Sequence, residues 1–301
     1  MKRTCCEQGS GVVSSHTRRT EPADTAGSTS QTRIEHPGTG SFTFSGAVPV
    51  CDRPIRVRYV APAGDLATAE ILFVMTGATR DAEDYQAAWE PLVRDRHVLV
   101  IIPVFHERDF PAAAYNLGNL VDGNGNPNPR DQWTFTVIHA LFNSVVADLH
   151  SRAEDFLMYG HSAGAQFVHR FLEVAPTRIR AAVAANAGWY TMPDTSKGFP
   201  YGLRGITKDE DLADSYSANF TVLLGADDIN PQDRLLRHDS GSDAQGSTRL
   251  ERGLSFYLTA RKSAEEHSLA FRWRLVVVPA VAHDHTAMAG AAAPILFGGT
   301  Q

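Results

Sequence analysis

The stretch that decides the fold is Phe156-Leu157-Met158-Tyr159-Gly160-His161-Ser162-Ala163-Gly164. Its first four residues are an apolar run typical of a buried strand, and residues 165–174 after it have a helix-like pattern. A G-x-S-x-G motif between a strand and a helix indicates a nucleophile elbow, a tight turn with the serine at its apex. Such a turn forces the serine backbone toward strained dihedral angles, and Gly160 and Gly164 let strand and helix approach closely. We therefore predict that Ser162 is a nucleophile, the alternative being a chance match in a chain rich in small residues.

On both sides of this stretch, apolar runs alternate with amphipathic segments. Strands are expected at residues 41–45, 55–59, 71–75, 97–103, 156–159, 181–187, 221–225 and 273–278. Helices are expected at residues 81–94, 135–149, 165–174, 250–265 and 286–293. The first two strands read as an antiparallel pair, and the later alternation predicts an α/β fold, a doubly wound, mostly parallel sheet with helices on both faces. Two irregular stretches, 108–133 and 191–217, are expected to border or cover a site at the carboxyl ends of the strands.

Composition limits the classes of protein to which the chain can belong. The 301 residues are 43% hydrophobic and carry a net charge of −6. The sequence has no basic stripe that would predict a nucleic-acid partner, and it has no run of 18 apolar residues that would predict a membrane span. Residues 1–38 are polar and lack periodicity, so we expect a disordered tail followed by one domain over 39–301.

The amino-terminal residues give little indication of export. The start is basic but lacks the apolar run of a signal peptide, so a cytoplasmic location is the default expectation. The three cysteines, Cys5, Cys6 and Cys51, do not suggest a disulfide framework, and we expect free thiols. A lipid-modified Cys5-Cys6 pair is the alternative.

A serine nucleophile needs a base and an acid that orients the base, and in this fold they follow the serine in the order acid, then histidine. Asp228 follows the strand that ends at Gly225 and is our choice for the acid, with Asp227 as the alternative. His283 follows the last strand and is our choice for the base, with His285 as the alternative. We expect His161 to pack with its side chain pointing away from the base.

Acyl transfer also requires N–H groups that stabilise the developing oxyanion. The backbone N–H of Ala163, directly after the nucleophile, is one predicted donor. The loop after residues 71–75 is expected to provide the other, with Gly77 permitting the turn and Ala78 as the donor. No metal or cofactor is expected: residues 122–126 begin like a calcium loop but Pro127 and Trp133 break the pattern, and the histidines of residues 283–285 have no second ligand cluster.

Several motifs together resemble those of α/β-hydrolases of the polyhydroxybutyrate-depolymerase-like esterase group. They are Thr76-Gly77 with Asp81 and Tyr85, Tyr115-Asn116-Leu117-Gly118-Asn119, Trp133-Thr134-Phe135, residues 160–167 around the elbow, and Asn186-Ala187-Gly188-Trp189-Tyr190. The resemblance covers about residues 69–295. It implies the α/β-hydrolase fold, a triad of Ser162, Asp228 and His283, and ester substrates.

The sequence thus predicts a serine esterase acting on small or polymeric esters, with an oligomeric state that the sequence does not indicate. Asn186, Trp189 and Tyr190 follow a strand end beside the elbow and are expected to line the acyl or alcohol pocket, core packing being the alternative for Trp189. Members of this group usually have histidine where this chain has Thr76, so a side chain that helps fix the oxyanion loop is missing. Acyl transfer, carbon–carbon bond hydrolysis and a non-catalytic binding role are the alternatives to ester hydrolysis.

Overall fold

The computed structural model describes residues 34, 36–46 and 54–298 and contains one sheet of eight strands in the order β1-β2-β4-β3-β5-β6-β7-β8. The strands are β1 (Gly38–Phe44), β2 (Ile55–Ala61), β3 (Glu70–Met75), β4 (Val98–Pro103), β5 (Phe156–His161), β6 (Ile179–Ala185), β7 (Phe220–Gly225) and β8 (Arg274–Val278). β2 pairs antiparallel with both β1 and β4, and the remaining neighbours are parallel. The predicted fold class is confirmed. Nearly all of the predicted tail, and all three cysteines, lie outside the described residues.

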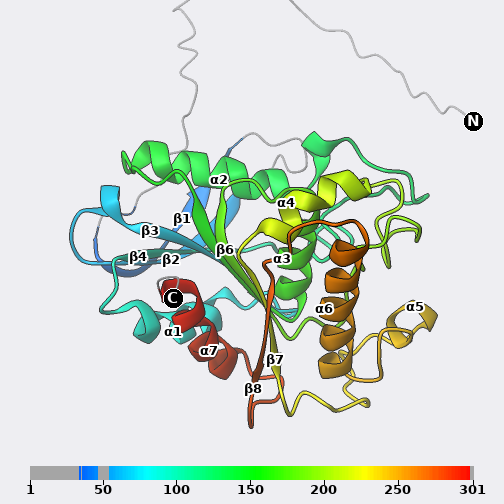
Figure 1. Ribbon diagram of the computed structural model, residues 1–301. Coiled ribbons are helices and arrows are strands. Elements are labelled where there is room, and N and C mark those ends of the chain that lie inside the picture. The colour runs from blue at the N-terminus through cyan, green and yellow to red at the C-terminus, as the bar shows by residue number, and fades with distance from the viewer. Residues whose placement is uncertain (1–33, 35, 47–53, 299–301) are drawn as a thin grey trace, which may run out of the picture.

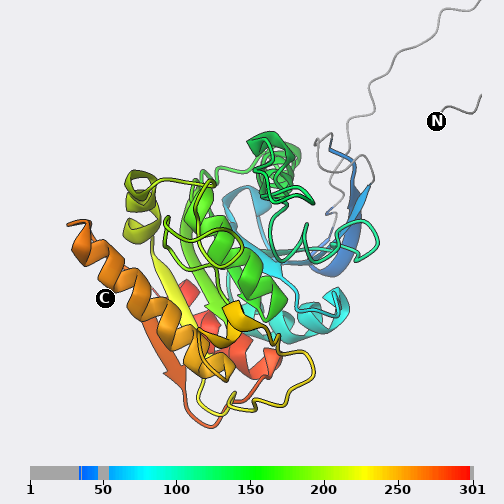
Figure 2. The same cartoon turned by 90° about the vertical axis from the view of Figure 1, so that its right-hand side faces the viewer.

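The helices form a layer on each face of this sheet (Figures 1 and 2). They are α1 (Ala82–Val93), α2 (Phe135–Asp148), α3 (Ala163–Val174), α4 (Leu212–Ser217), α5 (Ser240–Asp243), α6 (Arg249–Glu266) and α7 (His285–Phe297), with 3-10 turns at Leu66–Thr68, Arg130–Gln132 and Asp209–Asp211. α1 and α7 pack together on one face, whereas α2, α3, α4 and α6 contribute to the core on the other. The sheet therefore lies between two helical layers, as the apolar strands require.

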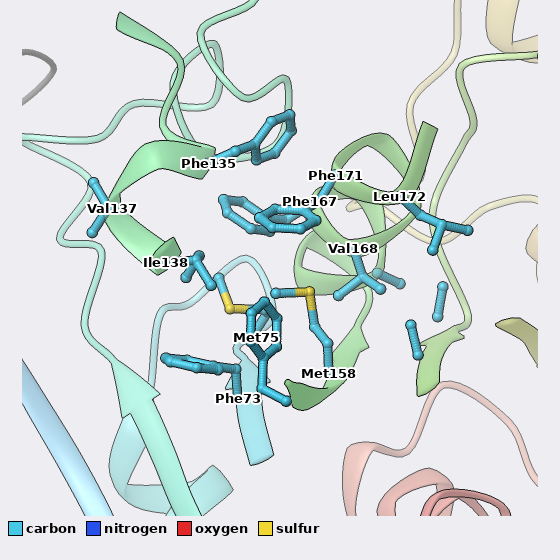
Figure 3. Packing of buried hydrophobic residues seen from close by; sticks show 14 of the residues in the cluster. Phe73, Met75, Phe135, Val137, Ile138, Met158, Phe167, Val168, Phe171 and Leu172 are labelled. Carbon is cyan, nitrogen blue, oxygen red and sulfur yellow. The ribbon is translucent and has the colours of Figure 1, made fainter. Parts of the chain in front are cut away.

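Alternate side chains of each strand enter different halves of the core. In β3, Phe73 and Met75 belong to the core under α2 and α3, while Leu72 and Val74 belong to the core under α1 and α7. Figure 3 shows Phe73 and Met75 beneath the aromatic rings that α2 and α3 contribute. This division follows from the two-residue period of a strand, and it explains why the runs are apolar throughout.

The two stretches predicted to be irregular differ from each other. Residues 108–133 form a long loop with a single 3-10 turn before α2. Residues 191–217 contain a 3-10 turn and the short helix α4, which sequence patterning did not reveal because six residues are too few to show a period. In the part of the chain that the structure describes, no helix combines the length and the apolar character needed to cross a membrane.

Parallel pairing sets the position of the candidate site. β3, β5, β7 and β8 run in the same direction, so the loops that follow them emerge at one edge of the sheet. Those loops carry Ala78, Ser162, Asp228 and His283. Open α/β sheets bind ligands at this edge.

Candidate active site

Ser162 lies at the apex of a sharp turn between β5 and α3. Its backbone has φ 57° and ψ −115°, a conformation that L residues rarely adopt. A Cβ atom on Gly160 would lie 2.3 Å from the Gly164 carbonyl oxygen, and one on Gly164 would lie 2.0 Å from the Met75 carbonyl oxygen. Both glycines are therefore required for the close approach of strand and helix, and the resulting turn presents the serine at the edge of the sheet.

Asp228 and His283 meet at the ends of β7 and β8. The Asp228 carboxylate is 3% exposed, and its Oδ2 atom lies 2.7 Å from His283 Nδ1. Asp227, the alternative acid, is exposed to solvent. His285, the alternative base, begins α7 and stacks on Tyr85 with ring centroids 4.8 Å apart. The geometry therefore favours the pair Asp228 and His283 over either alternative.

A pocket of about 270 Å³ opens beside this pair. Its lining residues are Gly77, Ala78, Thr79, Asp81, Asp84, Tyr85, His161, Ser162, Leu235, His283 and His285. Ser162 and His283 thus face one cavity together with the loop predicted to provide an oxyanion donor. The first N–H groups of a helix have no partner within the helix, so Ala163 N–H at the start of α3 can serve a ligand in this region.

Two tyrosines hold the loop that follows β3. The Tyr85 hydroxyl accepts a hydrogen bond from Gly77 N–H at 3.0 Å and lies 3.1 Å from His161 Nδ1. The Tyr115 hydroxyl donates to the Thr76 carbonyl oxygen at 2.8 Å. Arg80 lies over the Tyr115 ring at 3.7 Å, and burial raises the pKa of Tyr115 to about 12. These contacts therefore fix the loop. Gly77 N–H is engaged by Tyr85, while Ala78 lines the pocket.

Comparison with known proteins places the chain in a family. No protein-family profile and no curated protein matches the chain. Among solved structures, poly(aspartic acid) hydrolase-1 from Sphingomonas sp. KT-1 is 40% identical, with 87% of this chain and 99% of that chain covered and a TM-score of 0.83. A poly(3-hydroxybutyrate) depolymerase, LpqC from Bordetella parapertussis, is 30% identical over 88% of this chain and 91% of that chain, also with a TM-score of 0.83.

This chain belongs to the depolymerase-like α/β-hydrolases. It is a hydrolase. More distant proteins share the fold. An S-formylglutathione hydrolase from Staphylococcus aureus is 12% identical and has a TM-score of 0.57, with 87% of this chain and 98% of that chain covered.

One prediction about the elbow of this depolymerase-like hydrolase is wrong. His161 was expected to point away from the base, but its ring centroid lies 4.6 Å from that of His283, and His161 lines the pocket. The reason is Tyr85, whose hydroxyl contacts His161 Nδ1 and keeps the ring on this side. Burial, aided by neighbouring positive charge, holds the pKa of His161 well below its usual range, so the ring is neutral at physiological pH.

The three residues predicted to line the substrate pocket lie elsewhere in the hydrolase. Asn186 is 1% exposed, and its side chain donates to the Ala282 carbonyl oxygen and accepts from Gly225 N–H. Tyr190 is fully buried and stacks on Phe256. Trp189 is buried, and the guanidinium groups of Arg170 and Arg237 lie 4.4 and 4.9 Å from its ring centroid. β6 is the neighbour of β5 in the sheet, so these positions lie beside the elbow, but their side chains pack in the core and join loops.

Sequence reasoning missed other residues that support the site. Tyr85 and Tyr115 belong to the quoted motifs, but the sequence assigns them no role because the atoms that they contact lie on other segments. Arg249, 2% exposed, contacts the Asp228 carboxylate from the start of α6. A basic residue on an amphipathic helix usually faces solvent, so no pattern indicated this contact. Among the described residues, no group of three or more histidine, cysteine or acidic side chains has an arrangement suited to a metal ion.

Proposed function

We propose that this hydrolase cleaves carboxylic esters with Ser162 as nucleophile, His283 as general base and Asp228 as the orienting acid. The observation that carries the proposal is the 2.7 Å contact between Asp228 Oδ2 and His283 Nδ1, beside a pocket that His283 shares with Ser162. A carboxylate at Nδ1 keeps the proton on that nitrogen and leaves Nε2 free to accept the serine proton. The strained backbone of Ser162 is further support, since such strain occurs at functional sites.

The reaction follows from the roles of these atoms. Ser162 Oγ attacks the ester carbonyl carbon while His283 Nε2 takes the hydroxyl proton, and the carbonyl oxygen becomes an oxyanion. The N–H groups of Ala163 and Ala78 stabilise this charge. The tetrahedral intermediate expels the alcohol, which receives the proton from His283. A water molecule then attacks the acyl-enzyme by the same route and releases the acid and free Ser162.

The lining of the pocket favours a neutral ester over a polyanionic chain. Two acidic residues, Asp81 and Asp84, line the cavity, and Leu235 adds an apolar side chain that is 58% exposed. A volume of about 270 Å³ suits a short acyl group. We therefore propose short-chain hydroxyacid esters, including polyesters, as the substrate class.

Amide hydrolysis is a second candidate because the 40% identical relative is a poly(aspartic acid) hydrolase. The same triad cleaves amides when the leaving amine is protonated by the histidine. A panel of matched esters and amides, with one neutral and one anionic polymer, separates the two candidates. Release of soluble product from the neutral polyester alone supports ester cleavage, whereas faster release from poly(aspartic acid) overturns it. Products trapped by added alcohols would reveal acyl transfer.

The mechanism itself is tested with Ser162→Ala. This variant should lose hydrolysis of a p-nitrophenyl ester by a factor of about 10⁴ or more, while circular dichroism and thermal unfolding remain near those of the wild type. A fluorophosphonate probe should label the wild type at Ser162 and leave the variant unlabelled. Turnover that survives in Ser162→Ala would rule out this nucleophile.

A further inference from the structure

The Asp228 carboxylate has a second buried partner that the triad does not include. Its Oδ2 atom contacts His283 Nδ1 at 2.7 Å, while its Oδ1 atom lies 3.3 Å from Arg249 Nη1. Asp228 and Arg249 are 3% and 2% exposed. The guanidinium continues outward, and its Nη2 atom lies 3.3 Å from Asp233 Oδ1, whose side chain is 28% exposed. Imidazole, carboxylate, guanidinium and carboxylate therefore form one continuous row from the pocket toward the surface.

The fold fixes this row at both ends. Arg249 is the first residue of α6, where the Thr248 side chain caps the helix by accepting from Glu251 N–H. The next residue of the helix, Leu250, donates its N–H to the Asp228 carbonyl oxygen. Asp233 lies on the loop that follows Asp228 and accepts from Leu235 N–H. Since the arginine is held by its helix and the two acids by one loop, the row is a built feature rather than a chance surface contact.

The charges in the row act on the histidine in opposite directions. During the reaction His283 becomes positively charged, and Asp228 stabilises that charge. A guanidinium on the other oxygen of the same carboxylate opposes a second positive charge, and burial reduces the screening of this interaction. Asp233 in turn offsets Arg249. Although burial acts the other way, hydrogen bonds from Arg249 and from Leu235 N–H lower the pKa of Asp233, so it is ionised at neutral pH.

We propose that Arg249 is a positioning residue of this hydrolase, which orients Asp228 toward His283 and, with Asp233 as its counter-charge, sets the pH range over which His283 acts as a base. The proposal rests on the proposed function, in which His283 is that base. It adds a part that lies outside the catalytic triad and outside the oxyanion loop. Arg249 touches no substrate in this scheme and acts only through Asp228.

Other charged or titratable groups surround His283 and must be considered in any test. Besides the row itself, they are His161 of β5, Asp81, Asp84 and Tyr85 at the start of α1, and Asp284 and His285 at the start of α7. His161 is neutral because burial lowers its pKa, and burial raises the pKa of Tyr85. None of these groups changes in the variants proposed below, so their contributions cancel in the comparison.

The experiment measures kcat/KM against pH for a neutral p-nitrophenyl ester in full-length variants. Arg249→Gln keeps a hydrogen-bond donor and removes the charge. It should move the acid side of the profile upward by about one pH unit, since a nearby positive charge disfavours the protonated form of a histidine and its removal raises the pKa. Asp233→Asn should move it downward by a smaller amount, because Arg249 then lacks its counter-charge and His283 loses a nearby negative charge. Arg249→Lys keeps the charge and should retain the wild-type profile.

The chain provides a matched control one turn further along α6. Arg252 is also buried and pairs with Asp243 at 2.9 Å, but its other contacts go to the Gly188 and Gly246 carbonyl oxygens. Asp243→Asn therefore removes the surface carboxylate of a buried α6 arginine without touching the row. Its pH profile should coincide with that of the wild type.

Opposite shifts for Arg249→Gln and Asp233→Asn, with no shift for Asp243→Asn, support the proposal. A profile of Asp233→Asn that coincides with that of the wild type overturns the proposal, and this comparison remains valid if Arg249→Gln does not fold. A shift of the same size in Asp243→Asn also overturns the proposal, because it would show a general charge effect. Activity in Ser162→Ala would instead remove the proposed function, so the two failures are distinguishable.

Discussion

At the scale of single residues, two tyrosines stabilise the loop opposite Ser162. Tyr85 joins Gly77 of this loop to His161 of the elbow through one hydroxyl. Tyr115 holds the preceding carbonyl oxygen of Thr76. The two donors proposed for the oxyanion lie on the two segments that Tyr85 connects. Their relative position therefore depends on this side chain.

We predict that Tyr85→Phe lowers kcat while leaving KM and the fold nearly unchanged. The ring still packs on His285, but Gly77 N–H loses its acceptor and the loop loses its link to His161. Removal of a direct oxyanion donor costs about 10²–10³ in kcat, so an indirect change should cost about tenfold. Steady-state kinetics with a short ester measure the effect.

Tyr159→Phe is the control for this substitution. Tyr159 is also buried, and within the described residues its hydroxyl has no hydrogen-bond partner. Its replacement should leave kcat unchanged. Equal losses of kcat in both variants would mean that tyrosine burial, not the Gly77 contact, is responsible.

At the scale of elements, the elbow depends on how closely β5, α3 and β3 approach one another. Every residue of α3 is buried, an unusual pattern because most helices of a soluble domain expose one face. Gly164 lies against the backbone of Met75 and Thr76 at the end of β3. A side chain here would push α3 away from the strand and displace Ser162.

We therefore expect Gly164→Ala to destabilise the protein by about 3 kcal/mol or more, since a backbone contact at 2.0 Å cannot relax as a side chain does. Urea denaturation measures the change in the free energy of unfolding. Gly290→Ala, in the exposed face of α7 with no atom within 4 Å of the added Cβ, is the comparison and should stabilise by about 0.5–1 kcal/mol. Similar stabilities for the two variants would contradict the packing argument.

At the scale of the whole molecule, a buried carboxyl group in the last turn of α3 makes the stability of the hydrolase depend on pH. Glu173 is 1% exposed, and neither of its carboxylate oxygens has a hydrogen-bond partner among the described residues. Burial raises its pKa well above the usual 4.5, although the positive charge of Arg170 acts in the opposite direction. The folded state therefore holds a proton that the unfolded state releases at lower pH.

The sign of the pH effect follows from this difference. Between the unfolded and folded pKa values the folded state binds more protons, so stability falls as pH rises, by up to about 1.4 kcal/mol per pH unit. Glu173→Gln removes this dependence. The variant should match the wild type near pH 4.5 and be more stable than it at pH 8 by about 1 kcal/mol or more.

Urea denaturation at both pH values tests this expectation. Glu265→Gln, at an exposed position of α6, is the control and should lose stability with pH in parallel with the wild type. If the free energy of unfolding of Glu173→Gln falls with pH as much as that of the wild type, the buried carboxyl group is not the source of the pH dependence.

The sequence by itself determined the sheet, the elbow and the candidate triad. Apolar runs, helical periods and the G-x-S-x-G motif are local patterns, and the chain order of serine, acid and histidine is a property of the fold. The preference for Asp228 and His283 rested on their places after strand ends, which parallel pairing brings to one edge. Local chemistry and topology were sufficient for these features.

Only the tertiary structure decided which side chains surround that site. The side chains of Asn186 and Tyr190 point into the core and not into the pocket. The sequence could not show this, because a residue after a strand can contribute to either one and its position in the chain does not distinguish the two. Tyr85 and Arg249 act on groups 8 and 21 residues away along the chain, through contacts between different elements. Such contacts arise from packing, which depends on how helices cross the sheet rather than on any pattern within one segment.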